Sequence, residues 1–202
     1  MNILIDLLPK SVEISGTEYE INFDFRTSIL FEMMIQDEVL SDKEKIIKTL
    51  ELYYPVIPKD IDKNINEAID KALWFYQGGK DIKSQKSQSS TGKSEKVYSF
   101  EYDDEYIYSA FLDQYAFDLQ DVEELHWWKF KAMFKALKED NEIVKIMGYR
   151  AMTIDNKMSK EQKEYYRKMK KLYEIPKSKN EIEKINAIEE ALMGNGDLRG
   201  IL

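Results

Sequence analysis

Apolar and polar positions alternate in the first part of the chain and then recur at helical spacing. Over residues 11–23, polar side chains alternate with apolar ones such as Val12, Ile14 and Ile21, which is typical of strands with one buried face. Gly16 lies in the short polar run between the two halves of this stretch and favours a turn there. The pattern therefore predicts one small N-terminal β-hairpin.

The rest of the chain shows apolar side chains three or four residues apart, the spacing of amphipathic helices. Ser41 with Glu44 forms a capping box that marks one helix start. Ser159 with Gln162 forms a second such box. We expect a mainly α, bundle-like fold behind the hairpin, with one further short strand over residues 97–102. The helices are expected over residues 26–38, 41–54, 59–77, 104–115, 121–139, 141–149, 160–173 and 180–192.

One internal segment interrupts the periodicity. Residues 78–96 contain five serines and three glycines and almost nothing apolar. Such a segment cannot bury enough apolar surface to offset the entropy of ordering it. We interpret it as a flexible linker or long loop. It would join an N-terminal part, 1–77, to an aromatic-rich helical part, 97–177, and residues 178–202 would add a C-terminal helix with a frayed end.

The composition excludes several classes of chemical site and binding partner. The 202 residues contain no cysteine and one histidine, which removes disulfides, thiol nucleophiles and most zinc chemistry. A net charge of −8 argues against general binding to nucleic acids or anionic membranes. No apolar run approaches the roughly 20 residues of a membrane span, and residues 1–8 do not form a signal peptide. We expect a cytoplasmic binding protein without metal, cofactor or catalytic residues.

Two other functions stay open. An enzyme that uses carboxylates alone would depend on a pair such as Asp103 and Asp104, although we interpret these acids as helix-start residues. The stretch 141–177 is basic and would bind an acidic protein surface or, as a weaker alternative, RNA. Only two of its basic residues are arginines.

The predicted helix over residues 121–139 contains one tryptophan in an unusual position. On a helical wheel, His126 falls on the apolar stripe, whereas Trp128 points away from it, beside Lys131 and Lys135. A tryptophan on a charged face is either covered by another segment of the chain or an anchor for a partner. Trp128, Lys131 and Lys135 are therefore candidate protein-binding residues.

A second candidate surface is the segment ILFEMMI, residues 29–35, in which Glu32 is the only polar residue. A helix that is apolar almost all round is central in its domain or covered by another molecule. Phe31, Met33 and Met34 are the candidate contacts, because methionine side chains adapt to several apolar shapes.

Several blocks of this sequence resemble a known family. They are LPKSVEISGTEYEINFDFR near the start, then YSFEYDDEYIYSAFLDQY, LHWWKFKAMFKAL, KIMGYR and YYRKMKKLYEIP. Together they resemble the bacteriophage gene-product-fifteen family, which is encoded in the tail gene clusters of siphophages and prophages of Gram-positive bacteria. The resemblance covers most of the chain but neither residues 78–96 nor the end after residue 178.

The resemblance implies a role in phage tail morphogenesis. The family's gene position corresponds to that of tail assembly chaperones, which coat the tape-measure protein and help the tail tube polymerise around it in the host cytoplasm. The implied partners are the tape-measure protein and, as a further candidate, the tail tube protein. Such a chaperone would receive amphipathic helices in an apolar groove. The alternative is a structural minor tail or tail-completion component that self-associates and stays in the virion.

Overall fold

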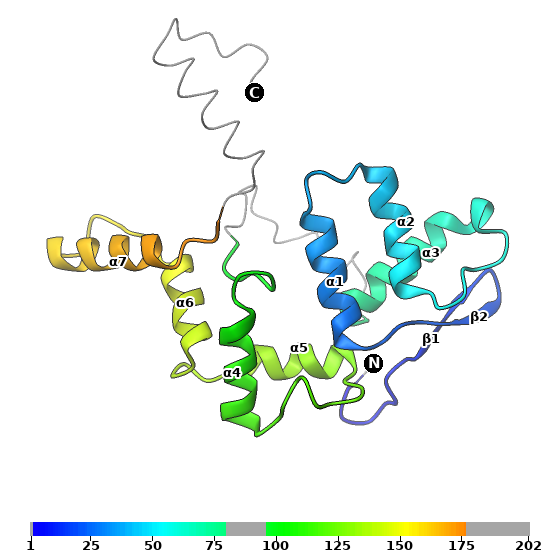
Figure 1. Ribbon diagram of the computed structural model, residues 1–202, viewed down its shortest axis with the longest axis horizontal. Helices are drawn as coiled ribbons and strands as arrows, with labels where there is room; N and C mark the ends of the chain where they lie inside the picture. Colours follow the sequence, from blue (N-terminus) through cyan, green and yellow to red (C-terminus); the bar gives the residue numbers. More distant parts are fainter. Residues whose placement is uncertain (1, 80–95, 177–202) are drawn as a thin grey trace, which may run out of the picture.

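The computed structural model describes residues 2–79 and 96–176 of the chain. Within them, helices predominate behind one antiparallel hairpin, which confirms the predicted mainly α fold (Figure 1). The helix predicted over residues 180–192 and most of the predicted linker lie outside the described residues, so the domain boundaries stay a prediction. The elements are β1 (Ser11–Ile14), β2 (Thr17–Glu20), α1 (Phe25–Gln36), α2 (Asp42–Tyr53), α3 (Ile61–Tyr76), α4 (Asp104–Tyr115), α5 (Trp127–Lys135), α6 (Glu142–Ala151) and α7 (Lys160–Leu172).

The hairpin forms where the alternation predicted it. Ser15 and Gly16 both have positive φ, at 49° and 75°, as a tight primed hairpin turn requires. Val12 and Ile14 are buried, and β1 packs against α3. The hairpin thus covers one side of the α1–α3 part of the molecule.

The capping residues in the sequence also predicted two helix starts correctly. The predicted capping boxes are present at α2, where Ser41 pairs with Glu44, and at α7, where Ser159 pairs with Gln162. Each box satisfies free N–H groups of the first turn, so these helix starts depend on contacts only three residues apart.

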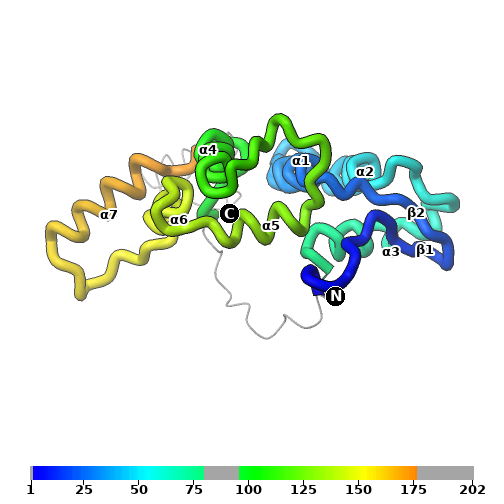
Figure 2. Tube along the Cα trace, turned by 90° about the horizontal axis from the view of Figure 1, so that it is seen from below, coloured from blue at the N-terminus to red at the C-terminus, as the bar shows by residue number. Residues whose placement is uncertain are grey.

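The two parts of the chain that flank residues 80–95 pack together through α5. In both views, α5 runs between α1 and the α4–α6 part, and α7 lies at the end of the molecule farthest from the hairpin (Figures 1 and 2). The Phe25 amide donates to the Leu125 carbonyl at 2.8 Å, and the Trp127 amide donates to the Phe23 carbonyl at 2.8 Å. Arg26 adds hydrogen bonds to backbone carbonyls of the loop before α5.

These hydrogen bonds correct the predicted helix over residues 121–139, which begins at Trp127 instead. Residues 122–126 do not follow helical geometry, and at Leu125 and His126 the backbone pairs with residues 23–25 instead. His126 is buried, as its place on the wheel indicated, but it is the residue before the helix and not part of it.

The predicted strand over residues 97–102 is also wrong. The described chain there has no regular structure and then turns into α4. Its alternation comes from Tyr98 and Phe100, whose rings lie 5.2 and 6.1 Å from that of Phe134 on α5. The aromatic spacing therefore reflects packing on a helix and not pairing with another strand.

His126 acts as the cap of α5 in its neutral form. Its Nδ1 accepts a hydrogen bond from the Trp128 amide at 3.1 Å, so this nitrogen carries no hydrogen. The hydrogen is on Nε2, which donates to the Pro9 carbonyl at 3.0 Å. Burial lowers the pKa of His126, and the charges of Lys129 and Lys10 act in the same direction.

We expect stability to depend on pH through His126. A folded-state pKa below the ordinary value means that the unfolded chain binds the proton more tightly. The contribution is therefore complete above pH of about 6.5 and is lost as the pH falls toward the folded pKa. Urea unfolding at pH of about 7 and about 5.5 measures the loss. His126→Asn keeps an N-cap acceptor without the titration, and an equal loss in this variant would contradict the assignment.

Candidate protein-binding groove

The structure places Trp128 in the core and not on an open surface. Its side chain is 6% exposed, and its Nε1 donates to the Phe75 carbonyl at 2.7 Å. Its ring lies 5.6 Å from that of Trp74, and Gly79 crosses over it so closely that an added Cβ would lie 2.5 Å from the indole. The expectation of an exposed partner anchor is wrong because the end of α3 covers this side of α5.

The two lysines near Trp128 do not form a site with it. Lys131 Nζ donates to the Tyr76 carbonyl at 2.9 Å and lies 5.5 Å from the centroid of the Trp127 ring. Lys135 is exposed in the last turn of α5, where a positive charge suits the helix dipole. Both lysines therefore have places in the fold that need no partner protein.

The candidate residues of the apolar helix α1 lie partly in the core and partly at the surface. Phe31 is buried, with its ring 5.2 Å from that of Tyr53, so it belongs to the core. Glu32 accepts a hydrogen bond from the Tyr76 hydroxyl at 2.5 Å, and burial together with this carboxylate raises the pKa of Tyr76. Met33 and Met34 are half-buried and border a groove.

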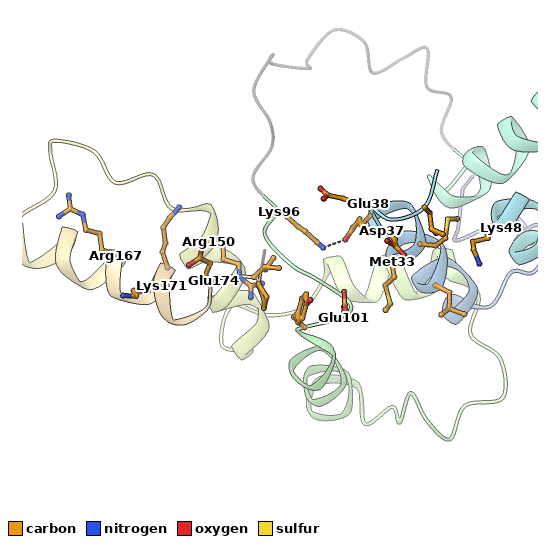
Figure 3. A pocket seen from close by; sticks show the side chains of 18 of the residues that line it. Met33, Asp37, Glu38, Lys48, Lys96, Glu101, Arg150, Arg167, Lys171 and Glu174 are labelled. Atoms are coloured by element: carbon orange, nitrogen blue, oxygen red, sulfur yellow. Dashed lines mark hydrogen bonds between the residues drawn. The ribbon is translucent and has the colours of Figure 1, made fainter. Parts of the chain in front are cut away.

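This groove has a volume of about 1340 Å³ and runs between α1 and α7 (Figure 3). We call it the α1–α7 groove. One wall consists of Leu30, Met33 and Met34 of α1, with Asp37 and Glu38 at its end. Leu30 is 53% exposed, so this wall presents apolar surface to the solvent. This volume is larger than the 300–1,000 Å³ usual for small-molecule pockets.

The opposite wall is mainly basic, although Glu174 also belongs to it. Arg167 and Lys171 project from α7 (Figure 3). Ile175 and Pro176, which follow the helix in the chain, also line the groove. Between the walls, Lys96 donates a hydrogen bond to the side chain of Gln36 in α1. The groove thus combines an apolar wall with a wall in which basic side chains outnumber acidic ones, while Asp37, Glu38 and Glu101 contribute acidic groups elsewhere in the lining.

A buried ion pair holds the α7 wall in place. Arg150 contacts Asp103 through two hydrogen bonds, Nη1–Oδ2 at 2.6 Å and Nη2–Oδ1 at 2.9 Å, and their side chains are 9% and 2% exposed. Arg150 Nε also donates to the Tyr173 carbonyl at 2.6 Å, directly after α7, and Nη1 donates to the Val97 carbonyl at 3.1 Å. One side chain of α6 therefore connects α4, the segment before it and the end of α7.

The pair changes the interpretation of two sequence features. Asp103 precedes α4, but its side chain makes no capping bond. Its carboxylate instead accepts hydrogen bonds from Arg150 and from the Ser99 amide. Arg150, one of the two arginines of the basic stretch, is buried and cannot contact an RNA phosphate in this fold. The prediction that the protein has no catalytic site stays a prediction.

A tyrosine cluster packs α7 against α6. The rings of Tyr149 and Tyr173 stack at 5.9 Å, and the hydroxyls of Tyr149 and Tyr165 lie 3.2 Å apart. The Tyr165 hydroxyl is the main cause that raises the pKa of Tyr149 to about 12. The aromatic contacts leave the basic side chains of α7 at the groove and in the solvent.

Across residues 2–79 and 96–176, histidine, aspartate and glutamate side chains nowhere gather in threes that could hold a metal ion. Among the helices of this described part, none has the length and apolar character needed to cross a membrane.

The sequence model of the family described as Bacteriophage Gp15 protein matches residues 4–175. The chain belongs to this family. The match runs from before β1 to just after α7, so it includes both helices of the α1–α7 groove. Membership in the Bacteriophage Gp15 family implies a phage structural or morphogenesis protein. Neither the curated proteins nor the solved structures contain a match to the chain.

Of the six residues singled out from the sequence, only Met33 and Met34 line the groove. Sequence reasoning missed Leu30, Arg167 and Lys171 as groove residues, although the basic stretch 141–177 contained a signal for two of them. Nothing in the linear pattern indicated that α7 would lie opposite α1.

Truncating Trp128 is expected to destabilise the fold. Trp128→Ala removes a buried ring and should lower the free energy of unfolding by about 3–5 kcal/mol. Leu30→Ala, at an exposed position, should change it by less than about 0.5 kcal/mol. Urea unfolding of both variants measures this difference, and a wild-type stability in Trp128→Ala would show that the ring is not part of the core.

Breaking the buried ion pair should have a similar cost. Arg150→Met leaves the Asp103 carboxylate buried without its partner, which should destabilise by about 3–5 kcal/mol. Arg150→Met combined with Asp103→Leu should recover a large part of this loss, because no buried charge then lacks a partner. The exposed Arg167→Met is the control. Additive losses in the double variant would contradict the pairing.

Proposed function

We propose that this protein is a tail assembly chaperone that binds the phage tape-measure protein in the host cytoplasm. Family membership supports the broader role in phage morphogenesis. The observation that carries the finer proposal is the α1–α7 groove, with two methionines and an exposed leucine on one wall. A chaperone needs such an open apolar surface because its client must be shielded from water before assembly.

The groove fits an amphipathic helix. The apolar face of a client helix would lie on Leu30, Met33 and Met34, and acidic side chains along its edge would face Arg167 and Lys171. Methionine side chains re-pack around different apolar shapes, so one groove can receive successive segments of a long helical client. The protein would act by binding and release, without a catalytic step or cofactor.

A structural tail component is the alternative that one observation favours. The N-terminal segment exposes Leu4, Ile5 and Leu7 at 80–94%, and Val39 between α1 and α2 is 84% exposed. Apolar surface of this kind, at residues that do not line the groove, is typical of subunit contacts. Self-association in the virion would cover it.

Binding of the client should depend on the apolar wall. Leu30→Glu and Met34→Glu, tested separately, are each expected to weaken binding to tape-measure helices by about 2 kcal/mol, which is roughly 30-fold. The matched control is Val56→Glu, which places the same charge at a 72% exposed position outside the groove. Isothermal titration with tape-measure segments measures the affinities, and thermal unfolding verifies each variant.

Equal binding by Leu30→Glu, Met34→Glu and the Val56→Glu control would exclude the groove as the client site.

Quantitative mass spectrometry of purified particles and infected-cell lysate distinguishes the chaperone from the structural tail component. A protein present in lysate but absent from particles is a chaperone, whereas a fixed copy number in particles identifies a structural component.

A further inference from the structure

The described chain ends inside the α1–α7 groove. Ile175 and Pro176, the last described residues, are part of the groove lining. Residues 177–202 follow them, and this segment lies beyond the family match, which ends at residue 175. The continuation of the chain therefore starts at the groove itself and needs no long connection to reach it.

The sequence of this continuation matches what the groove can hold. Over residues 180–192, apolar side chains recur at Ile182, Ile185, Ile188 and Leu192, which is the spacing of an amphipathic helix. The same stretch contains four glutamates and one lysine. It thus offers one apolar stripe and an excess of negative charge.

Each wall of the groove has a counterpart in this segment. The isoleucine stripe corresponds to the apolar wall of Leu30, Met33 and Met34, and the glutamates correspond to Arg167 and Lys171 on α7. Burial of an apolar stripe supplies affinity, and the opposite charges set the orientation of the helix between the walls.

We propose that residues 177–202 dock as an amphipathic helix into the α1–α7 groove of their own chain. Residues 177–179 span at most about 10 Å, enough to connect Pro176 to a helix lying in the groove. A helix over residues 180–192 is about 20 Å long. Because the connection is short, the effective concentration of the segment at the groove is in the millimolar range, and modest affinity suffices.

Docking of this segment would regulate the groove. Any other helix has to displace residues 177–202, so its apparent affinity falls by the fraction of molecules in which the groove is open. The segment would protect the apolar wall while no client is bound. This regulatory consequence rests on the proposed function, whereas the docking itself does not.

The first experiment compares the full chain with a chain ending at Pro176, which keeps every described element. Hydrogen peroxide oxidises accessible methionines, and mass spectrometry gives the rates at Met33 and Met34. Removal of residues 177–202 should raise both rates by about tenfold if the docked state has a population of about 90%. Met169 and Met147, which do not line the groove, serve as internal references.

The second experiment adds a synthetic peptide of residues 177–202 to the truncated chain. The peptide should restore protection of Met33 and Met34 and bind saturably, with an affinity that falls as salt is raised. Arg167→Glu with Lys171→Glu should weaken this binding by about tenfold or more. Lys168→Glu, on an exposed face of the same helix outside the groove, should leave it unchanged.

A third variant covers the case in which the truncated chain fails to fold. Ile185→Glu with Ile188→Glu in the full chain leaves every described residue unchanged and should raise oxidation of Met33 and Met34 as truncation does. Equal oxidation in the full chain and this variant, together with no binding of the peptide, would overturn the proposal. These readouts use this chain alone, so a failure to bind the tape-measure protein leaves them unaffected.

Discussion

A guanidinium group carries enough N–H donors to satisfy a carboxylate and backbone carbonyls at once, and Arg150 does so in the interior of this protein. Burying a charged pair is costly unless its remaining hydrogen-bonding groups are satisfied, and here no buried side-chain polar atom of the described residues lacks a partner. Arg150 connects α6 to α4 through Asp103 and to the end of α7 through Tyr173. Together with the tyrosine cluster between α6 and α7, this contact network sets the position of α7 opposite α1, and therefore the groove.

Sequence reasoning succeeded where structure depends on neighbours along the chain. The hairpin turn at Gly16 and the capping boxes at Ser41 and Ser159 involve contacts within a few residues, and all three are present. It failed where a distant segment decides the outcome. Leu125 and His126 are not helical because their backbone pairs with residues 23–25, and Trp128 is buried because α3 covers it.

The apolar helix α1 shows why one sequence segment supported two interpretations. Its pattern predicted either a central helix or a surface covered by another molecule, and in the structure one face lies in the core while another borders the groove. Phe31 faces the core and contacts Tyr53, whereas Met33 and Met34 line the groove. Composition could not assign these faces, because a helix that is apolar almost all round does not indicate which side its neighbours occupy.

The junction between the two parts of the chain contains all three tryptophans of the protein. Trp127 and Trp128 begin α5, and their indole N–H groups donate to the carbonyls of Tyr76 and Phe75 at the end of α3, beside Trp74. Intrinsic tryptophan fluorescence therefore reports on the contact between α3 and α5 without any added label. Since none of these rings lines the groove, emission would remain constant while the groove fills and would change when the two parts separate.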